Sequence, residues 1–138
     1  MNSIVIINKE KIDLSECKGF SEADFNPDLT FDCGQCFRWE KNRDGIWETP
    51  EAIDDLQVYF DFARDYGKIR KHLSEGDPVM ARAIEAGRGI RILKQDSWET
   101  LVSFIVSQNN NIPRIKGCIR KLAELFGEAG QLPTPERL

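Results

Sequence analysis

The spacing of apolar and polar positions changes near residue 55, which divides the chain into two kinds of structure. Before that point the apolar residues form short runs or alternate with polar ones, a spacing typical of β-strands. After it they recur at intervals of three and four residues, as in helices with one buried face. The pattern predicts an α+β fold, with an antiparallel β region over residues 1–55 and a helical region over residues 56–138.

In the first region, the apolar run over residues 3–7 predicts a short strand. Between residues 31 and 39 large side chains alternate with polar ones, which predicts a half-buried strand interrupted by Gly34. A glycine inside a strand often marks a bulge or a close approach of the backbone to another group. Asp44-Gly45 predicts a hairpin turn with two positive φ angles, and Trp47 then begins the return strand.

In the second region, the pattern predicts a helical stretch over residues 56–73 that is weakened or broken near Gly67. A helix capped by Asp77-Pro78 should end at Gly87, and a capping box should start another helix at Asp96. The last full helix should end at Gly127, with an apolar stripe of Ile115, Cys118, Ile119, Leu122, Leu125 and Phe126. Core packing is expected for the aromatic side chains of Trp98, Phe104 and Phe126.

Three consecutive amides, Asn109, Asn110 and Asn111, separate the last two predicted helices. Such side chains compete for backbone hydrogen bonds and suit a tight interhelical link. With Arg114 and Lys116 they place amides, a guanidinium and an ammonium close together, a plausible surface for base edges and phosphates. A polar turn without any ligand is the alternative.

Composition places the chain among ordinary globular proteins and leaves its partner open. Its 138 residues suffice for one domain, or for a small domain and part of another, and 30% of them are charged. The net charge of −4 argues against nucleic acid, but residues 79–121 hold eight basic and three acidic residues. These basic residues are expected around the Asn turn, although a solvated face would also explain them.

The cysteines do not predict a metal site, and nothing in the sequence predicts a cofactor. Cys33 and Cys36 have Cys-x-x-Cys spacing, but Cys17 and Cys118 stand alone and His72 is the only histidine. Reduced, packed thiols are expected. No apolar run approaches the roughly 20 residues of a membrane span, and residues 4–7 are too short for a signal peptide, so we expect a cytoplasmic protein without membrane partners.

Two motifs resemble the 8-oxoguanine DNA glycosylase family. Residues 29–39, LTFDCGQCFRW, are similar to its N-terminal Gly-Gln-x-Phe-Arg-Trp signature, and residues 92–127 resemble the first helices of its glycosylase domain. The resemblance implies a TBP-like N-terminal sheet, apparently shortened here, followed by the start of a helix-hairpin-helix glycosylase domain. It also implies a monomer that binds double-stranded DNA containing 8-oxoguanine and cleaves the abasic site after excision.

The same resemblance implies roles for matching positions. The main-chain carbonyl of Gly34 would accept a hydrogen bond from N7–H of the flipped lesion. Asn109 would fill the space left by that base, and Arg114 would read the orphaned cytosine. Asn110, Asn111 and Lys116 would complete the DNA-binding set. Phe37, Arg38 and Trp39 would support the strand that carries Gly34.

Two departures from the family pattern keep other functions open. Few residues are available for strands after Trp47, and no lysine or aspartate stands in the family's catalytic motif, so no catalytic residue is expected in this chain. We therefore expect the N-terminal part of a glycosylase and lyase that is inactive by itself. The alternatives are a catalytically inactive module that binds damaged DNA, and an interaction domain that does not bind DNA.

Overall fold

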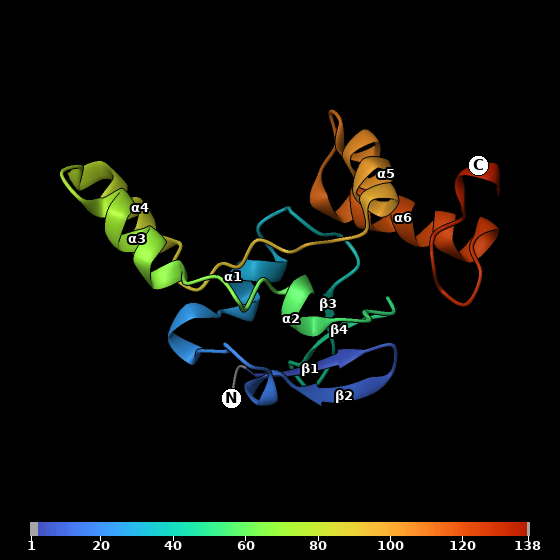
Figure 1. Cartoon of the computed structure of the whole chain (residues 1–138). Helices are drawn as coiled ribbons and strands as arrows, with labels where there is room; N and C mark the ends of the chain where they lie inside the picture. Colours follow the sequence, from blue (N-terminus) through green and yellow to red (C-terminus); the bar gives the residue numbers. More distant parts are fainter. Residues whose placement is uncertain (1–2, 138) are drawn as a thin grey trace.

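A small four-stranded sheet forms the base of the protein, whose computed structural model describes residues 3–137 (Figure 1). Its strands are β1 (Ile4–Ile7), β2 (Glu10–Asp13), β3 (Glu40–Lys41) and β4 (Trp47–Thr49), in the order β2-β1-β4-β3. The pairs β1–β2 and β3–β4 are antiparallel, whereas β1 and β4 are parallel. The α+β class and the strand near residues 3–7 are confirmed, but the prediction of an entirely antiparallel region is wrong. The long segment between β1 and β4 allows the chain to return in the same direction.

The two hairpins use different turns. Asn8 and Lys9, with φ of 47° and 71°, form the tight connection between β1 and β2. The predicted hairpin before Trp47 is confirmed, but only Gly45, with φ of 77°, has a positive φ there. The expected pair of positive φ angles is wrong because residues 42–46 form a longer loop. In this loop the Asn42 side chain accepts hydrogen bonds from the main-chain N–H groups of Asp44 and Ile46, both at 3.0 Å.

The predicted strand over residues 31–39 is wrong. Helix α1 (Pro27–Phe31) occupies its start, with Asn26 as N-cap and Pro27 in the first turn. Residues 32–39 then follow an irregular path, and Gly34 turns the chain with φ of 85°. Four consecutive side chains at its end are buried, which a half-buried strand cannot achieve: Cys36, Phe37, Arg38 and Trp39.

The helices follow the predicted caps closely. They are α2 (Leu56–Tyr59), α3 (Tyr66–Ser74), α4 (Pro78–Ala86), α5 (Ser97–Ser107) and α6 (Ile112–Phe126). Short 3₁₀ turns cover Leu14–Glu16, Glu22–Asp24 and Pro135–Arg137. Asp77 and Asp96 accept hydrogen bonds from N–H groups of α4 and α5, and Gly87 and Gly127 directly follow α4 and α6, as predicted. The predicted interruption of residues 56–73 is confirmed, but it lies between α2 and α3, and the prediction that it is near Gly67 is wrong because Gly67 belongs to α3.

Figure 1 shows the helix pair α3–α4 and the helix pair α5–α6 on opposite sides of the central region. An aromatic core lies between the sheet and α1 and α2, where the rings of Phe31 and Trp39 stack at 4.0 Å between centroids. Residues beyond position 55 also belong to this core, namely Tyr59, Phe60, Phe62 and Leu93. A second, smaller cluster joins Phe37 to Ile115 and Ile119 of α6, so it attaches the irregular segment to the helices.

Several apolar side chains that were expected in the core lie on the surface. Phe104 is 62% exposed and Phe126 is 52% exposed, so the prediction of core packing is wrong for both within residues 3–137. Trp98 is half-buried, and its indole N–H donates to the main-chain oxygen of Pro133 at 2.8 Å. The buried positions of α6 are Ile115, Ile119 and Ala123, while Cys118 and Leu125 are exposed. The outer faces of α5 and α6 are therefore apolar and uncovered in the part of the chain that the structure describes.

Over the same residues, no helix combines the length and the apolar character needed to cross a membrane.

Candidate nucleic-acid interface

The side chain of Gln35 holds the irregular segment in place. Its amide N–H group donates to the main-chain oxygens of Thr30 and Arg91, at 2.9 and 2.8 Å. Its carbonyl oxygen accepts from the main-chain N–H of Leu93 at 3.0 Å. The main-chain oxygen of Gln35 in turn accepts from the side chain of Gln95 at 2.6 Å. One amide therefore replaces the ladder that a regular strand would provide and joins residues 30–39 to residues 91–95.

Gly34 precedes this amide at an exposed turn. Its φ of 85° lies in the region that favours glycine, and a Cβ there would meet no atom within 4 Å. No residue between 3 and 137 donates a hydrogen bond to the Gly34 carbonyl. Alanine at this position would be strained by the backbone conformation and not by a lack of space.

A cavity of about 320 Å³ separates the Gly34 turn from helices α5 and α6. Ser107 and Ile112, which flank the Asn turn, belong to its wall together with Gly34. The other lining residues are Gln35, Phe37, Thr100, Ser103, Phe104 and Ile115. The structure thus brings together the two motifs that the sequence singled out. The wall offers apolar faces, hydroxyls and main-chain groups, but no amine or carboxylate, so it can bind a planar polar molecule but lacks a nucleophile with a base.

The three asparagines of the turn have different structural tasks. Asn111 is the N-cap of α6 and accepts from the N–H of Arg114 at 3.1 Å. Asn110 is half-buried, and its side-chain amide donates to the main-chain oxygen of Val106 at 3.1 Å. Asn109 lies at the exposed tip with φ of 50°, a conformation that asparagine tolerates better than most residues. Of the three side chains, only that of Asn109 has no hydrogen bond to residues 3–137.

Arg114 and Lys116, the two basic residues predicted to contact DNA, differ in exposure and in hydrogen bonding. Arg114 is exposed in the first turn of α6, and its guanidinium has no ion pair within residues 3–137. Lys116 is half-buried, and its ammonium donates to the main-chain oxygen of Trp39 at 3.0 Å. That hydrogen bond attaches α6 to the segment before β3 and uses one of the three N–H donors of the ammonium.

The expectation that the basic residues surround the Asn turn is wrong for Arg82, Arg88 and Arg91. Arg91 is only 2% exposed, where its guanidinium donates to main-chain oxygens of Phe60 and Asp61. Burial lowers the pKa of this guanidinium. Arg82 and Arg88 belong to or follow α4, on the opposite side of the central region from α5 and α6 (Figure 1). The surface beside the turn is consequently less basic than the sequence count suggested.

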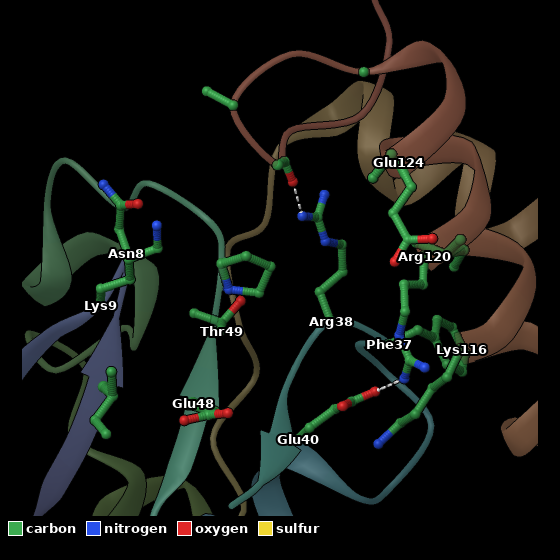
Figure 2. A pocket seen from close by; sticks show the side chains of 17 residues that line it. Asn8, Lys9, Phe37, Arg38, Glu40, Glu48, Thr49, Lys116, Arg120 and Glu124 are labelled. Atoms are coloured by element: carbon green, nitrogen blue, oxygen red, sulfur yellow. Dashed lines mark hydrogen bonds and ion pairs between the residues drawn. The ribbon is translucent and has the colours of Figure 1, made fainter.

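A larger cavity of about 790 Å³ lies between the ends of the β-strands and α6, and only Lys116 of the predicted site residues lines it (Figure 2). Figure 2 shows Arg38 extending to the main-chain oxygen of Gly130 and Arg120 pairing with Glu40. Four basic and three acidic side chains line this cavity, and Arg120 is paired with Glu40, so the lining has no strong preference for one sign of charge. The cavity beside Gly34 therefore remains the better candidate for the site.

The cysteines are placed as isolated thiols. Cys36 is buried, which raises the pKa of its thiol, while Cys33 and Cys118 are exposed. The expectation of packed thiols is therefore wrong for those two residues. Within residues 3–137 no group of histidine, cysteine and acidic side chains has an arrangement that could hold a metal ion.

The fold is of the α+β class, and one cavity is bordered both by the Gly34 turn and by residues that flank the Asn turn. A family model described as the 8-oxoguanine DNA glycosylase, N-terminal domain, matches residues 19–50 and 47–101. These residues make up more than half of the chain, and the chain belongs to the 8-oxoguanine DNA glycosylase family, of which it carries the N-terminal portion.

Individual relatives agree with this assignment. A solved structure of MBOgg1 in complex with a low-affinity DNA ligand is 44% identical and has a TM-score of 0.74, covering 84% of this chain and 50% of that chain. The Clostridium acetobutylicum 8-oxoguanine glycosylase/lyase, solved with double-stranded DNA containing cytosine opposite 8-oxoG, is 36% identical with a TM-score of 0.75, covering 84% of this chain and 50% of that chain. The N-glycosylase/DNA lyase OGG1 of Arabidopsis thaliana is 28% identical over 148 residues, covering 80% of this chain and 40% of the relative. The chain thus spans about half the length of these relatives.

Sequence reasoning found Gly34 and the Asn turn but missed the function of Gln35. The glutamine is part of the signature that carries the resemblance, yet it was placed in a strand, where a side chain would not bond three main-chain groups. The available signal was the position of Gln35, a polar residue that follows a glycine and lies between aromatic residues in the sequence.

The different tasks of the asparagines predict opposite effects on stability. Asn111→Ala should lower the free energy of unfolding by about 1 kcal/mol, because it removes the N-cap of α6. Asn109→Gly should leave it unchanged or raise it slightly, because glycine adopts a positive φ without strain. Urea unfolding followed by circular dichroism measures both. Equal losses in the two variants would show that the turn acts as one unit.

Proposed function

We propose that this chain is the part of an 8-oxoguanine DNA glycosylase/lyase that recognises the lesion and the opposite strand. The observation that carries the proposal is the cavity that Gly34 shares with residues flanking the Asn turn. Two relatives have been solved in complex with DNA, and in one of these complexes cytosine lies opposite 8-oxoG. Double-stranded DNA containing 8-oxoguanine is accordingly the proposed partner.

The Gly34 turn supplies a plausible discriminator between 8-oxoguanine and guanine. A flipped lesion carries a hydrogen on N7, whereas guanine has a bare acceptor at that atom. The Gly34 carbonyl has no other donor within residues 3–137, and glycine has no side chain of its own that could obstruct a ligand. This oxygen would accept a hydrogen bond from the lesion and repel the N7 lone pair of guanine.

The Asn turn supplies the contacts with the opposite strand. Asn109 is exposed at the tip with an uncommitted amide, so it can enter the space that a flipped base leaves. Arg114 follows it in the first turn of α6, and a guanidinium there can donate two hydrogen bonds to the acceptors of an orphaned cytosine. Asn110 and Asn111 would contribute by shaping the turn.

The chemical step would require groups that the cavity does not provide. Base excision coupled to strand cleavage needs an amine that attacks the sugar C1′ and forms a Schiff base. Neither an amine nor a carboxylate lines the cavity beside Gly34 in the described part of the chain. We propose that the catalytic groups belong to the half of the relatives that this chain does not match, and that the exposed apolar faces of α5 and α6 pack against that half. A damaged-DNA-binding module without catalysis is the alternative, favoured by the same cavity lining.

Binding to matched duplexes tests the recognition role of Gly34. The chain should bind a duplex with 8-oxoguanine opposite cytosine more tightly than the same duplex with guanine, and Gly34→Ala should abolish that preference. Gly45→Ala is the control, since Gly45 has a similar φ of 77° and equally open surroundings but lies in the hairpin before β4. Each alanine should cost a similar amount of stability, about 1–2 kcal/mol.

Fluorescence anisotropy at two salt concentrations measures these affinities and separates phosphate contacts from base contacts. If both variants lost the preference for 8-oxoguanine, the loss would be attributed to general strain in the fold and not to the carbonyl of Gly34. Equal affinity of the unmodified chain for both duplexes would contradict the proposed function.

Covalent trapping tests the assignment of the chemistry. This chain, incubated with lesion duplex and borohydride, should yield no protein–DNA adduct, because a trapped adduct requires an amine nucleophile at C1′. The Clostridium acetobutylicum glycosylase/lyase is the positive control. An adduct formed by this chain would contradict this assignment, because it would show that one of the chain's own amines is the nucleophile.

A further inference from the structure

Ser103 differs from the other residues that line the cavity beside Gly34, because its hydroxyl group is buried without a hydrogen bond. The residue lies in the middle of α5 and is only 8% exposed. Within residues 3–137 its hydroxyl neither donates nor accepts a hydrogen bond. No fully enclosed side-chain nitrogen or oxygen in those residues lacks a partner, so the hydroxyl is open to the cavity that Ser103 lines. A polar group in this position costs stability unless a ligand or water binds it.

The other polar side chains around this cavity are already hydrogen-bonded to the protein. The Gln35 amide holds three main-chain groups. The hydroxyls of Thr100 and Ser107 each donate, at 2.7 Å, to a main-chain oxygen three or four residues earlier. Such bonds satisfy a hydroxyl within its own helix. In the described lining, Ser103 is therefore the one side chain whose donor and acceptors are both free.

An acceptor and a donor without partners thus line one cavity from two different segments. The main-chain oxygen of Gly34 belongs to the irregular segment and receives no hydrogen bond within residues 3–137, and the free O–H of Ser103 belongs to α5. The proposed ligand has the matching pattern. In 8-oxoguanine the N7–H donor lies between two oxo oxygens, one at C8 and one at C6. A base that donates N7–H to Gly34 therefore presents an acceptor on either side of that hydrogen bond.

We propose that Ser103 is a base-binding residue whose hydroxyl donates a hydrogen bond to an oxo oxygen of the flipped 8-oxoguanine, next to the N7–H contact with Gly34. The assignment rests on the proposed function of the cavity. The oxygen at C6 is also present in guanine, so a contact there adds affinity for any flipped guanine base. The oxygen at C8 is present only in the lesion, so a contact there adds to discrimination. Both oxygens have the same chemistry as acceptors, and one analogue separates them.

Unfolding in urea tests whether the hydroxyl has a structural task. Ser103→Ala should leave the free energy of unfolding unchanged or raise it, because the change removes a buried hydroxyl without a partner and places a strong helix former in α5. A lower free energy of unfolding in Ser103→Ala would show that the hydroxyl stabilises the fold, and would overturn the proposal.

Binding to a duplex with 8-oxoguanine opposite cytosine tests the contact itself. Ser103→Ala should weaken this binding by about three- to tenfold, as expected for the loss of one hydrogen bond between neutral groups, and should leave binding to the undamaged duplex unchanged. Ser74→Ala is the control, because Ser74 lies at the end of α3, away from the cavity lining, and its hydroxyl donates to the main chain of its own helix. It should bind both duplexes like the unmodified chain. No weakening in Ser103→Ala, or equal weakening on lesion and undamaged duplexes, would contradict the role of Ser103.

A duplex containing 2-amino-8-oxopurine, which keeps N7–H and the C8 oxygen but has hydrogen at C6, identifies the acceptor. If the hydroxyl donates to the C6 oxygen, Ser103→Ala and the unmodified chain should bind this duplex equally. If it donates to the C8 oxygen, the same three- to tenfold weakening should remain. An unmodified chain that binds lesion and undamaged duplexes equally would defeat the proposed function, and this role with it. A preference for the lesion that is the same in Ser103→Ala would defeat the role of Ser103 alone.

Discussion

The amide of Gln35 is the constraint on which the site depends. Residues 32–39 contain no regular secondary structure, yet their last four side chains are buried and their turn at Gly34 has a fixed position. Three main-chain groups find their partner in this one side chain, at distances of 2.8 to 3.0 Å. Without it, the main-chain oxygen of Arg91 would lack a donor and that of Thr30 would keep only the Cys33 thiol as a weak donor, which is costly in a packed interior.

Structural and recognition tasks are divided between adjacent residues at both ends of the cavity. Gln35 is committed to the fold, whereas Gly34 next to it presents a carbonyl without a partner in the described residues. Asn111 and Asn110 complete the helix ends, whereas Asn109 is left at the tip. This division explains how short motifs can combine a rigid backbone with groups that are available for a ligand. The family assignment and the solved DNA complexes of relatives suggest DNA as the ligand to test.

Local sequence signals predicted the helices well, because caps and glycine stops act over a few residues. Asp77, Asp96 and Gly127 all lie at the predicted helix boundaries. Features that depend on residues distant in the sequence were predicted wrongly. The alternation of large and polar side chains over residues 31–39 does not come from a strand. It comes from the end of α1 and from Gln35, whose side chain accepts a hydrogen bond from the distant Leu93. The sequence also could not predict that Phe104 is exposed, because helical periodicity identifies an apolar face but does not show whether another element covers it.

Amide hydrogen exchange at Leu93 tests the central role of Gln35 most directly, because this N–H donates to the Gln35 side chain and to no other group in the described chain. In Gln35→Leu, exchange at Leu93 should accelerate strongly, and the free energy of unfolding should fall by about 2–4 kcal/mol as three main-chain groups lose their partner. Gln57→Leu, which removes one exposed hydrogen bond, should leave Leu93 protected. Unchanged protection of Leu93 in Gln35→Leu, with unchanged stability, would contradict the account.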